Sequence, residues 1–158
     1  MKIPRYSLAV ASSSVLLAVS AVSLPVLAQP AAKTAPAMER SEHEWKGGGA
    51  SSTFDALWSG KELKMIREEL RASDGMIEKN EYMFNQGALL HYKQDRYSAK
   101  GKKGPEEATM VSFEKSERAI ISMRKVDGNA TGPASAAAIA AAKKHLAELL
   151  AITGKIRR

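Results

Sequence analysis

Residues 63–126 read LKMIREELRASDGMIEKNEYMFNQGALLHYKQDRYSAKGKKGPEEATMVSFEKSERAIISMRKV. Apolar and β-favouring residues occur here in short runs, and turn-forming residues separate one run from the next. The runs that we predict to be strands span 63–72, 77–85, 89–97, 108–114 and 119–126. Because short connections favour antiparallel neighbours, the segment predicts a β-meander of about five strands.

The strongest turn signal is the pair Asp74-Gly75, between the first two runs. Both central positions of a type I′ turn have positive φ, and Asp-Gly is one of the pairs that favour it. A helix is the alternative for residues 63–72, whose Glu, Leu, Lys, Met and Arg residues all favour helix. Since a hairpin turn follows directly, we predict a strand there.

Residues 134–152 are dominated by alanine and leucine and predict an α-helix. Gly132-Pro133 precedes this segment, and proline is favoured in the first helical turn. The apolar residues at helical spacing form one stripe: Ile139, Ala142, Leu146, Leu149 and Leu150. Gly154 predicts the end of the helix. The predicted fold class is α+β, with one antiparallel sheet and this helix packed on one of its faces.

The N-terminus predicts an export signal over residues 1–28. Lys2 and Arg5 precede an uncharged, largely apolar run over 8–24, and the side chains of Val26 and Ala28 fit a cleavage site after residue 28. A transmembrane anchor is the alternative, although a run of about 17 residues is near the lower limit for a span. We therefore expect a periplasmic or extracellular protein with no membrane-spanning segment once the signal is cleaved.

The segment from 29 to 53 is rich in Ala, Pro, Gly and charged residues and shows neither a helical nor a strand period. This composition predicts a disordered linker. A small folded domain is then expected over 54–154, followed by a basic tail over 155–158. The chain has no cysteine, so disulfides and thiolate metal sites are excluded.

Two-residue loops after the first and second strands would fix the register of the sheet. Ile66 then lies opposite Met83, and Tyr82 lies opposite His91. One pair is unfavourable, because Glu68 would lie opposite Glu81. The face predicted to pack against the helix would collect Ile66, Leu70, Met83, Leu90 and Tyr92, with Val111 or Phe113 and with Ile121 or Met123.

The same register would bring Arg67, Tyr82 and His91 together on the opposite face, with Phe84 and Leu89 beside them. A guanidinium, a phenol and an imidazole can together hold a carboxylate, a phosphate or a sulfated sugar. These three residues are the predicted ligand-binding site. The alternative is a half-solvated sheet surface with ordinary cross-strand pairs.

The chain carries a formal net charge of +7, and much of the excess lies near its C-terminus. The predicted basic surface consists of Lys143, Lys144, Lys155, Arg157 and Arg158. Such a surface can bind an anionic polymer or a membrane surface in a salt-dependent way. Solubility alone is the alternative explanation.

Catalytic motifs are missing from the sequence, which has no Gly-rich phosphate loop, no His-Glu-x-x-His and no nucleophile elbow. The histidines at 43, 91 and 145 fall on three separate segments, so we expect neither a metal nor a cofactor site. Nucleic-acid binding is not expected either, because the basic residues of the sheet are dispersed.

These observations predict a small non-enzymatic module that binds a protein or a cell-envelope component through an open sheet face. Binding of an anionic polymer is the first alternative, and a hydrolase with a non-standard site is the second. The oligomeric state stays open, because an exposed outer strand can pair with another chain.

Overall fold

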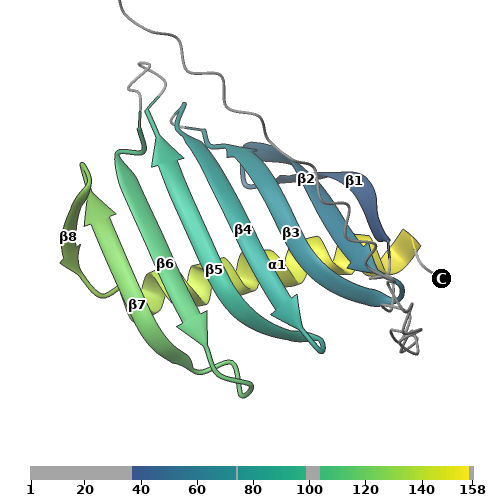
Figure 1. The fold of residues 1–158 in the computed structure, drawn as a ribbon. Coiled ribbons are helices and arrows are strands. Elements are labelled where there is room, and N and C mark those ends of the chain that lie inside the picture. The colour runs from purple at the N-terminus through teal and green to yellow at the C-terminus, as the bar shows by residue number, and fades with distance from the viewer. Residues whose placement is uncertain (1–36, 74, 99–103, 157–158) are drawn as a thin grey trace, which may run out of the picture. The chain divides into compact units, whose positions relative to one another are not determined.

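The computed structural model describes residues 37–73, 75–98 and 104–156. In these residues, one antiparallel sheet contains eight strands in chain order, and a single helix lies across one of its faces (Figure 1). The elements are β1 (Met38–Gly47), β2 (Ala50–Ser59), β3 (Glu62–Arg71), β4 (Ile77–Asn85), β5 (Ala88–Tyr97), β6 (Glu107–Phe113), β7 (Ala119–Val126), β8 (Asn129–Gly132) and α1 (Ala136–Ile156). The prediction of an α+β fold with a C-terminal helix packed on an antiparallel sheet is confirmed.

The five strands predicted from the sequence are present as β3 to β7, and each bound differs from the prediction by at most one residue. The helical alternative for residues 63–72 is excluded, since β3 occupies them almost completely. The sheet is nevertheless larger than predicted. β1 and β2 extend it at one edge and β8 extends it at the other.

The predicted disordered linker over 29–53 was wrong for the residues that the structure describes, because β1 and the first part of β2 lie there. In β1, His43 and Trp45 point toward the helix and are buried or half-buried, whereas residues 42, 44 and 46 are charged and exposed. A strand with polar residues on both faces shows little hydrophobic contrast, which is why its composition resembles a linker. Residues 29–36 and the predicted signal over 1–28 lie outside the described residues.

Several hairpin turns have a left-handed backbone at both central positions, as a type I′ turn requires. The φ angles are 51° and 80° at Gln86-Gly87, and 47° and 81° at Asp127-Gly128. The predicted two-residue loop between β4 and β5 is therefore present, with Asn85 opposite Ala88.

Gln86 is a non-glycine residue at positive φ, a conformation that asparagine adopts more readily than glutamine. Gln86→Asn should raise the free energy of unfolding by about 0.5 kcal/mol, because asparagine tolerates the left-handed region better than glutamine does. The backbone N–H of residue 86, which donates to Glu62 Oε1 at 2.7 Å, is unchanged by the substitution. Urea denaturation measures the difference. Gln86→Val is the opposite control and should destabilise, and equal stabilities for the two variants would contradict the argument.

The first hairpin differs from its prediction by one residue. Gly75 N–H donates to the carbonyl of Ala72, and Ala72 N–H donates to the carbonyl of Met76. This is a three-residue loop with Gly75 at φ 81°, rather than a two-residue loop centred on Asp74-Gly75. The extra residue shifts β3 against β4 by one position.

The shift exchanges the two faces of β4 relative to β3, so Tyr82 and not Met83 lies on the same face as Ile66. Ile66 lies opposite Tyr82 instead of Met83, and Arg67 lies opposite Glu81. The predicted clash of Glu68 with Glu81 is thereby removed, since Glu68 lies opposite Asn80. A one-residue slip moves every side chain of a strand to the other face, so the predicted core and site change together.

A bulge in the β4–β5 pair adds a second shift. Phe84 lies opposite Leu89 as predicted, but the next pairs are Met83 with His91 and Tyr82 with Tyr92. Phe84, Leu89 and Tyr82 are therefore buried on the face that α1 covers, which we call the helix face. The opposite face, which carries Arg67 and Met83, we call the open face.

The core lies between the helix face and α1. Its buried hydrophobic residues are Phe54, Ala56, Ile66, Tyr82, Phe84, Leu89, Tyr92, Val111, Phe113, Ala134, Leu146 and Leu149. The predicted helix stripe is confirmed, because Leu146 and Leu149 are buried and the other three members pack against the core. Met83 and Ile121 were wrongly predicted as core residues and are exposed. Met123 is half-exposed and lies opposite the exposed Met110, so it belongs to the open face.

Helix α1 begins with a side-chain cap, since Ser135 Oγ accepts a hydrogen bond from the N–H of Ala138 at 3.1 Å. The predicted end at Gly154 was wrong, because the helix continues to Ile156. Within the described part of the chain, no helix combines the length and apolar character needed to cross a membrane.

Candidate functional site

The open face carries alternating charges along the middle of its strands. One row of the register places Asp55, Arg67, Glu81 and Lys93 side by side on β2 to β5. Arg40 Nε donates to Asp55 Oδ1 at 2.8 Å, and Arg67 Nε donates to Glu81 Oε2 at 3.0 Å. These side chains line a shallow hollow of about 370 Å³ together with Glu42, Glu69, Lys79 and Asp95. Because cations and carboxylates alternate, the hollow presents paired charges of both signs.

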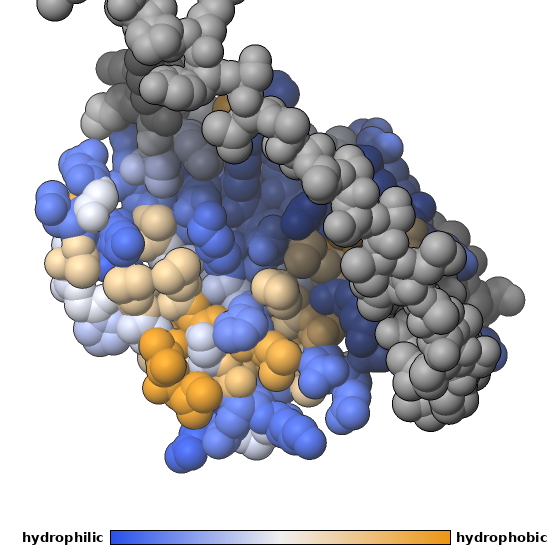
Figure 2. Space-filling model, viewed as in Figure 1, coloured by the Kyte–Doolittle hydropathy of each residue, from blue (hydrophilic) through white to orange (hydrophobic). Residues whose placement is uncertain are grey.

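Apolar side chains gather beside this hollow, toward the β4–β5 and β6–β7 turns. We call Met65, Met83, Met110, Met123 and Ile121 the methionine patch. The register places Met65 opposite Met83, and Met110 opposite Met123. Met110 is 41% exposed and Ile121 is 66% exposed. Figure 2 shows hydrophobic residues collected in the lower part of this view and hydrophilic residues above them.

The structure separates the three residues of the predicted ligand site. Arg67 and His91 lie on the open face, where Arg67 pairs with Glu81 and His91 Nδ1 contacts Ser112 Oγ at 3.0 Å. Tyr82 lies on the helix face and is only 1% exposed. Its burial raises the pKa of the phenol far above the ordinary value, and its ring stacks on Tyr92. The arrangement predicted for Arg67, Tyr82 and His91 is therefore not present.

One residue of the predicted basic surface, Lys143, makes contacts within the protein. Lys143 Nζ donates to the carbonyl of Glu117 at 2.6 Å and lies 5.0 Å from the centre of the Phe113 ring. Lys144 is exposed on α1. The side chains of Lys155, Arg157 and Arg158 lie outside the described residues.

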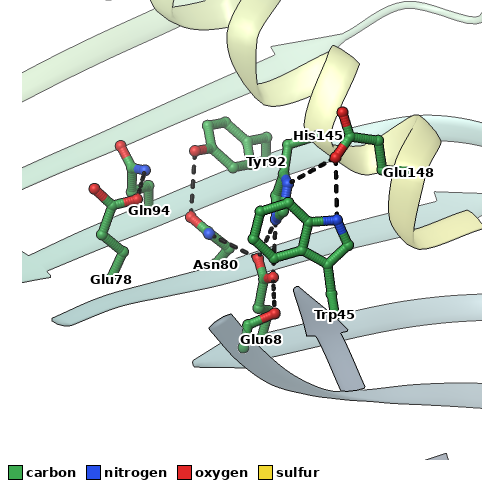
Figure 3. A network of polar contacts seen from close by, with 9 residues as sticks. Trp45, Glu68, Glu78, Asn80, Tyr92, Gln94, His145 and Glu148 are labelled. Carbon is green, nitrogen blue, oxygen red and sulfur yellow. Dashed lines mark hydrogen bonds and ion pairs between the residues drawn. The ribbon is translucent and has the colours of Figure 1, made fainter. Parts of the chain in front are cut away.

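A second polar cluster, which was not predicted from the sequence, lies between the helix face and α1 (Figure 3). Its centre is the Glu68 carboxylate, whose side chain is 0% exposed. Glu68 accepts hydrogen bonds from Ser52 Oγ at 2.5 Å, from Asn80 Nδ2 at 2.9 Å and from His145 Nε2 at 2.8 Å. Three strands and the helix therefore contribute one side chain each.

The outer part of this cluster joins β1 to α1. Trp45 Nε1 donates to Glu148 Oε2 at 3.0 Å, and the same oxygen lies 4.0 Å from His145 Nδ1. The rings of Trp45 and His145 meet edge to face, with centres 4.7 Å apart. A Cβ atom at Gly47 would lie 2.6 Å from the Trp45 ring, so the indole depends on glycine at that position.

The two central groups shift each other's ionisation. Burial alone would raise the pKa of Glu68, but hydrogen bonds from His145, Ser52 and Asn80 together lower it below the ordinary value. Burial alone would lower the pKa of His145, but Glu68 raises it above the ordinary value, with smaller contributions from Glu148 and Glu78. A carboxylate and an imidazolium are thus favoured as an ion pair inside the fold.

The hydrogen bonds of this cluster hold the helix against the sheet. A carboxylate that orients a histidine also occurs in hydrolytic triads, where the second ring nitrogen faces a nucleophile. Here the second nitrogen, Nδ1 of His145, faces the carboxylate of Glu148 and the indole of Trp45. These groups hold the imidazole in place.

Within residues 37–73, 75–98 and 104–156, no three His, Asp or Glu side chains converge closely enough to hold a metal ion. Comparison with known proteins gave no matching family model, no matching curated protein and no matching solved structure.

Proposed function

We propose that this protein is a binding module that holds another protein through its open face. The observation that carries the proposal is the composition of that face, where an exposed methionine patch lies directly beside a hollow of paired charges. Stable protein interfaces combine an apolar centre with a polar rim, and methionine is enriched at such centres. Contiguous exposed apolar surface on a soluble domain is itself typical of interaction sites.

The arrangement of layers supports the same proposal. α1 covers one face of the sheet, and no other described element lies over the open face. An antiparallel sheet can leave one face to solvent, but that face is then predominantly polar. The part of the open face formed by β4 to β7 departs from this rule. Its apolar residues Met83, Met110 and Ile121 are all exposed.

The experiment compares two substitutions that add the same charge at different surfaces. Met110→Glu places a carboxylate in the methionine patch, whereas Ala141→Glu places one on the solvent side of α1. Affinity purification of the full chain from its host should retain a specific protein. Titration of that protein should show binding weakened about tenfold or more by Met110→Glu, as expected for a central interface residue.

The matched control is expected to leave binding within about twofold of wild type, since a distant surface charge has little effect. Equal binding by wild type and Met110→Glu, with both proteins folded by circular dichroism, would overturn the proposal.

A further inference from the structure

The outer edge of β7 is only partly paired. β8 pairs with Arg124, Lys125 and Val126 alone. In the described part of the chain no strand pairs with the outer side of residues 119–123, and these are Ala-Ile-Ile-Ser-Met. Figure 1 shows the short β8 beside one end of β7, with no strand beside the other end.

The backbone of this free edge faces outward at defined positions. Thr131 Oγ1 donates to the carbonyl oxygen of Arg124 at 3.2 Å, so the peptide groups of Arg124 face the β8 side. Backbone groups alternate between the two sides of an antiparallel strand. Ser122, two residues earlier, therefore directs its N–H and C=O toward the outer side of β7, where no described strand pairs with it.

The side chains of the free edge add apolar surface. Ile120 is 56% exposed and Ile121 is 66% exposed, and Ile121 belongs to the methionine patch. An uncharged, β-favouring edge is a template for another strand, and folded proteins usually protect such an edge with charge or proline. This edge has neither between 119 and 123.

The charged residues at both ends of the segment 119–123 determine which kind of partner strand can pair with it. Residues 114–125 contain four cations, Lys115, Arg118, Arg124 and Lys125, against the two carboxylates of Glu114 and Glu117. Arg118 pairs with Glu114 and Arg124 pairs with Glu107 on β6, so Lys115 and Lys125 are the cations outside these pairs. The cations flank residues 119–123 at both ends. Pairing with a second copy would bring together two edges that each carry an excess of positive charge, which is unfavourable. A segment with acidic residues at its ends is complementary to both ends.

We infer that β7 accepts an extended peptide segment of a partner protein as an additional strand, with apolar side chains beside Ile121 and acidic residues at both ends. This inference deepens the proposed function and depends on it for the identity of the partner. Main-chain hydrogen bonds to an edge strand give affinity, and alternate side chains give specificity. The strand would lie next to the methionine patch and extend the apolar part of the open face.

The test uses the full chain and a defined probe, the labelled peptide Glu-Glu-Thr-Val-Thr-Val-Thr-Glu-Glu. Ser122→Pro removes the outward N–H and is compatible with an edge position. It should weaken binding of the probe about tenfold or more in fluorescence anisotropy. Ser122→Ala keeps the backbone donor and should bind within about twofold of wild type. The same peptide N-methylated at each threonine and valine should not bind, since neither of its edges can then form the ladder.

Several outcomes would overturn the inference. One is equal binding of the N-methylated probe or of the folded Ser122→Pro variant, and another is equal binding of a probe with lysines in place of glutamates. A dimer in sedimentation that Ser122→Pro abolishes would assign the edge to a second copy instead. If Met110→Glu weakens binding of the captured partner but Ser122→Pro does not, the inference about the β7 edge is refuted and the open-face function is not. Probe binding at the edge without any effect of Met110→Glu on the captured partner would refute only the open-face function.

Discussion

His145→Ala is expected to lower the free energy of unfolding by about 3 kcal/mol at pH 6. The substitution removes the only imidazole that contacts Glu68 among the described residues and leaves the carboxylate buried. Removing one partner of a buried ion pair costs more than the pair itself contributes, because an uncompensated charge remains in a medium that solvates it poorly. Ser52 and Asn80 still donate to Glu68, which keeps the expected loss near the lower end of the usual range.

The pH dependence follows from the two pKa shifts. His145 has a pKa raised from 6.5, so its contribution is complete below pH 6.5 and is lost as the pH rises through the raised value. Glu68 has a pKa lowered from 4.5, so its contribution is complete above pH 4.5 and is lost as the pH falls through the lowered value. The difference between wild type and His145→Ala should therefore be largest between these limits. Glu148 and Glu78 also face His145 and support its charged form.

Chemical denaturation at a series of pH values measures this difference. Lys144→Ala is the matched control, because it removes a neighbouring cation from the exposed side of the same helix, and it should change stability by less than about 0.5 kcal/mol. The double variant Glu68→Leu/His145→Leu should be more stable than the sum of the two single losses predicts. Strict additivity of the two single variants, or a loss that does not vary with pH, would contradict the ion pair.

The fold was predictable from the sequence wherever hydrophobic contrast was strong. β3 to β7 combine β-favouring runs with turn residues, and the leucines of α1 recur at one helical spacing, so both the elements and the layer arrangement could be predicted. β1 was missed because its inward residues include His43 and Trp45 among charges, and such a segment shows no clear apolar period. The alternation in Glu42-His43-Glu44-Trp45 was the signal that could have indicated a strand.

The site was less predictable because it depends on register, and register depends on single residues in turns. Whether the first hairpin has two or three loop residues decides if Met83 or Tyr82 lies on the helix face beside Ile66. Both loops are compatible with the sequence around Gly75, since glycine provides positive φ in either. Only the packed sheet selects between them, through burial of Ile66 and through the pairing of Arg67 with Glu81.

The Glu68–His145 pair joins residues 77 positions apart, and no local pattern connects them. A histidine beside an apolar helix stripe, together with a glutamate inside a strand, was the available signal. It became interpretable only once the helix was placed across β3. The pair and the helix stripe therefore have to be tested together, because both hold α1 against the sheet.

Leu149→Ala tests the apolar part of that contact and is expected to lower the free energy of unfolding by about 3 kcal/mol. Leu149 is 0% exposed and belongs to the core cluster, so truncation loses buried surface and leaves a cavity that the rigid sheet cannot fill. Leu150→Ala is the control, because Leu150 is only partly buried and should lose about half as much. Alanine favours helix, so helix propensity cannot account for a loss.

Circular dichroism during urea denaturation distinguishes two ways in which Leu149→Ala can act. If α1 and the sheet fold as one unit, the helical signal and tryptophan fluorescence should change in a single transition at lower urea. Trp45 contacts His145 on α1, so its fluorescence reports on the same interface. A loss below about 1 kcal/mol, or a helical transition that leaves the fluorescence transition unchanged, would show that α1 does not stabilise the sheet in the way its burial implies.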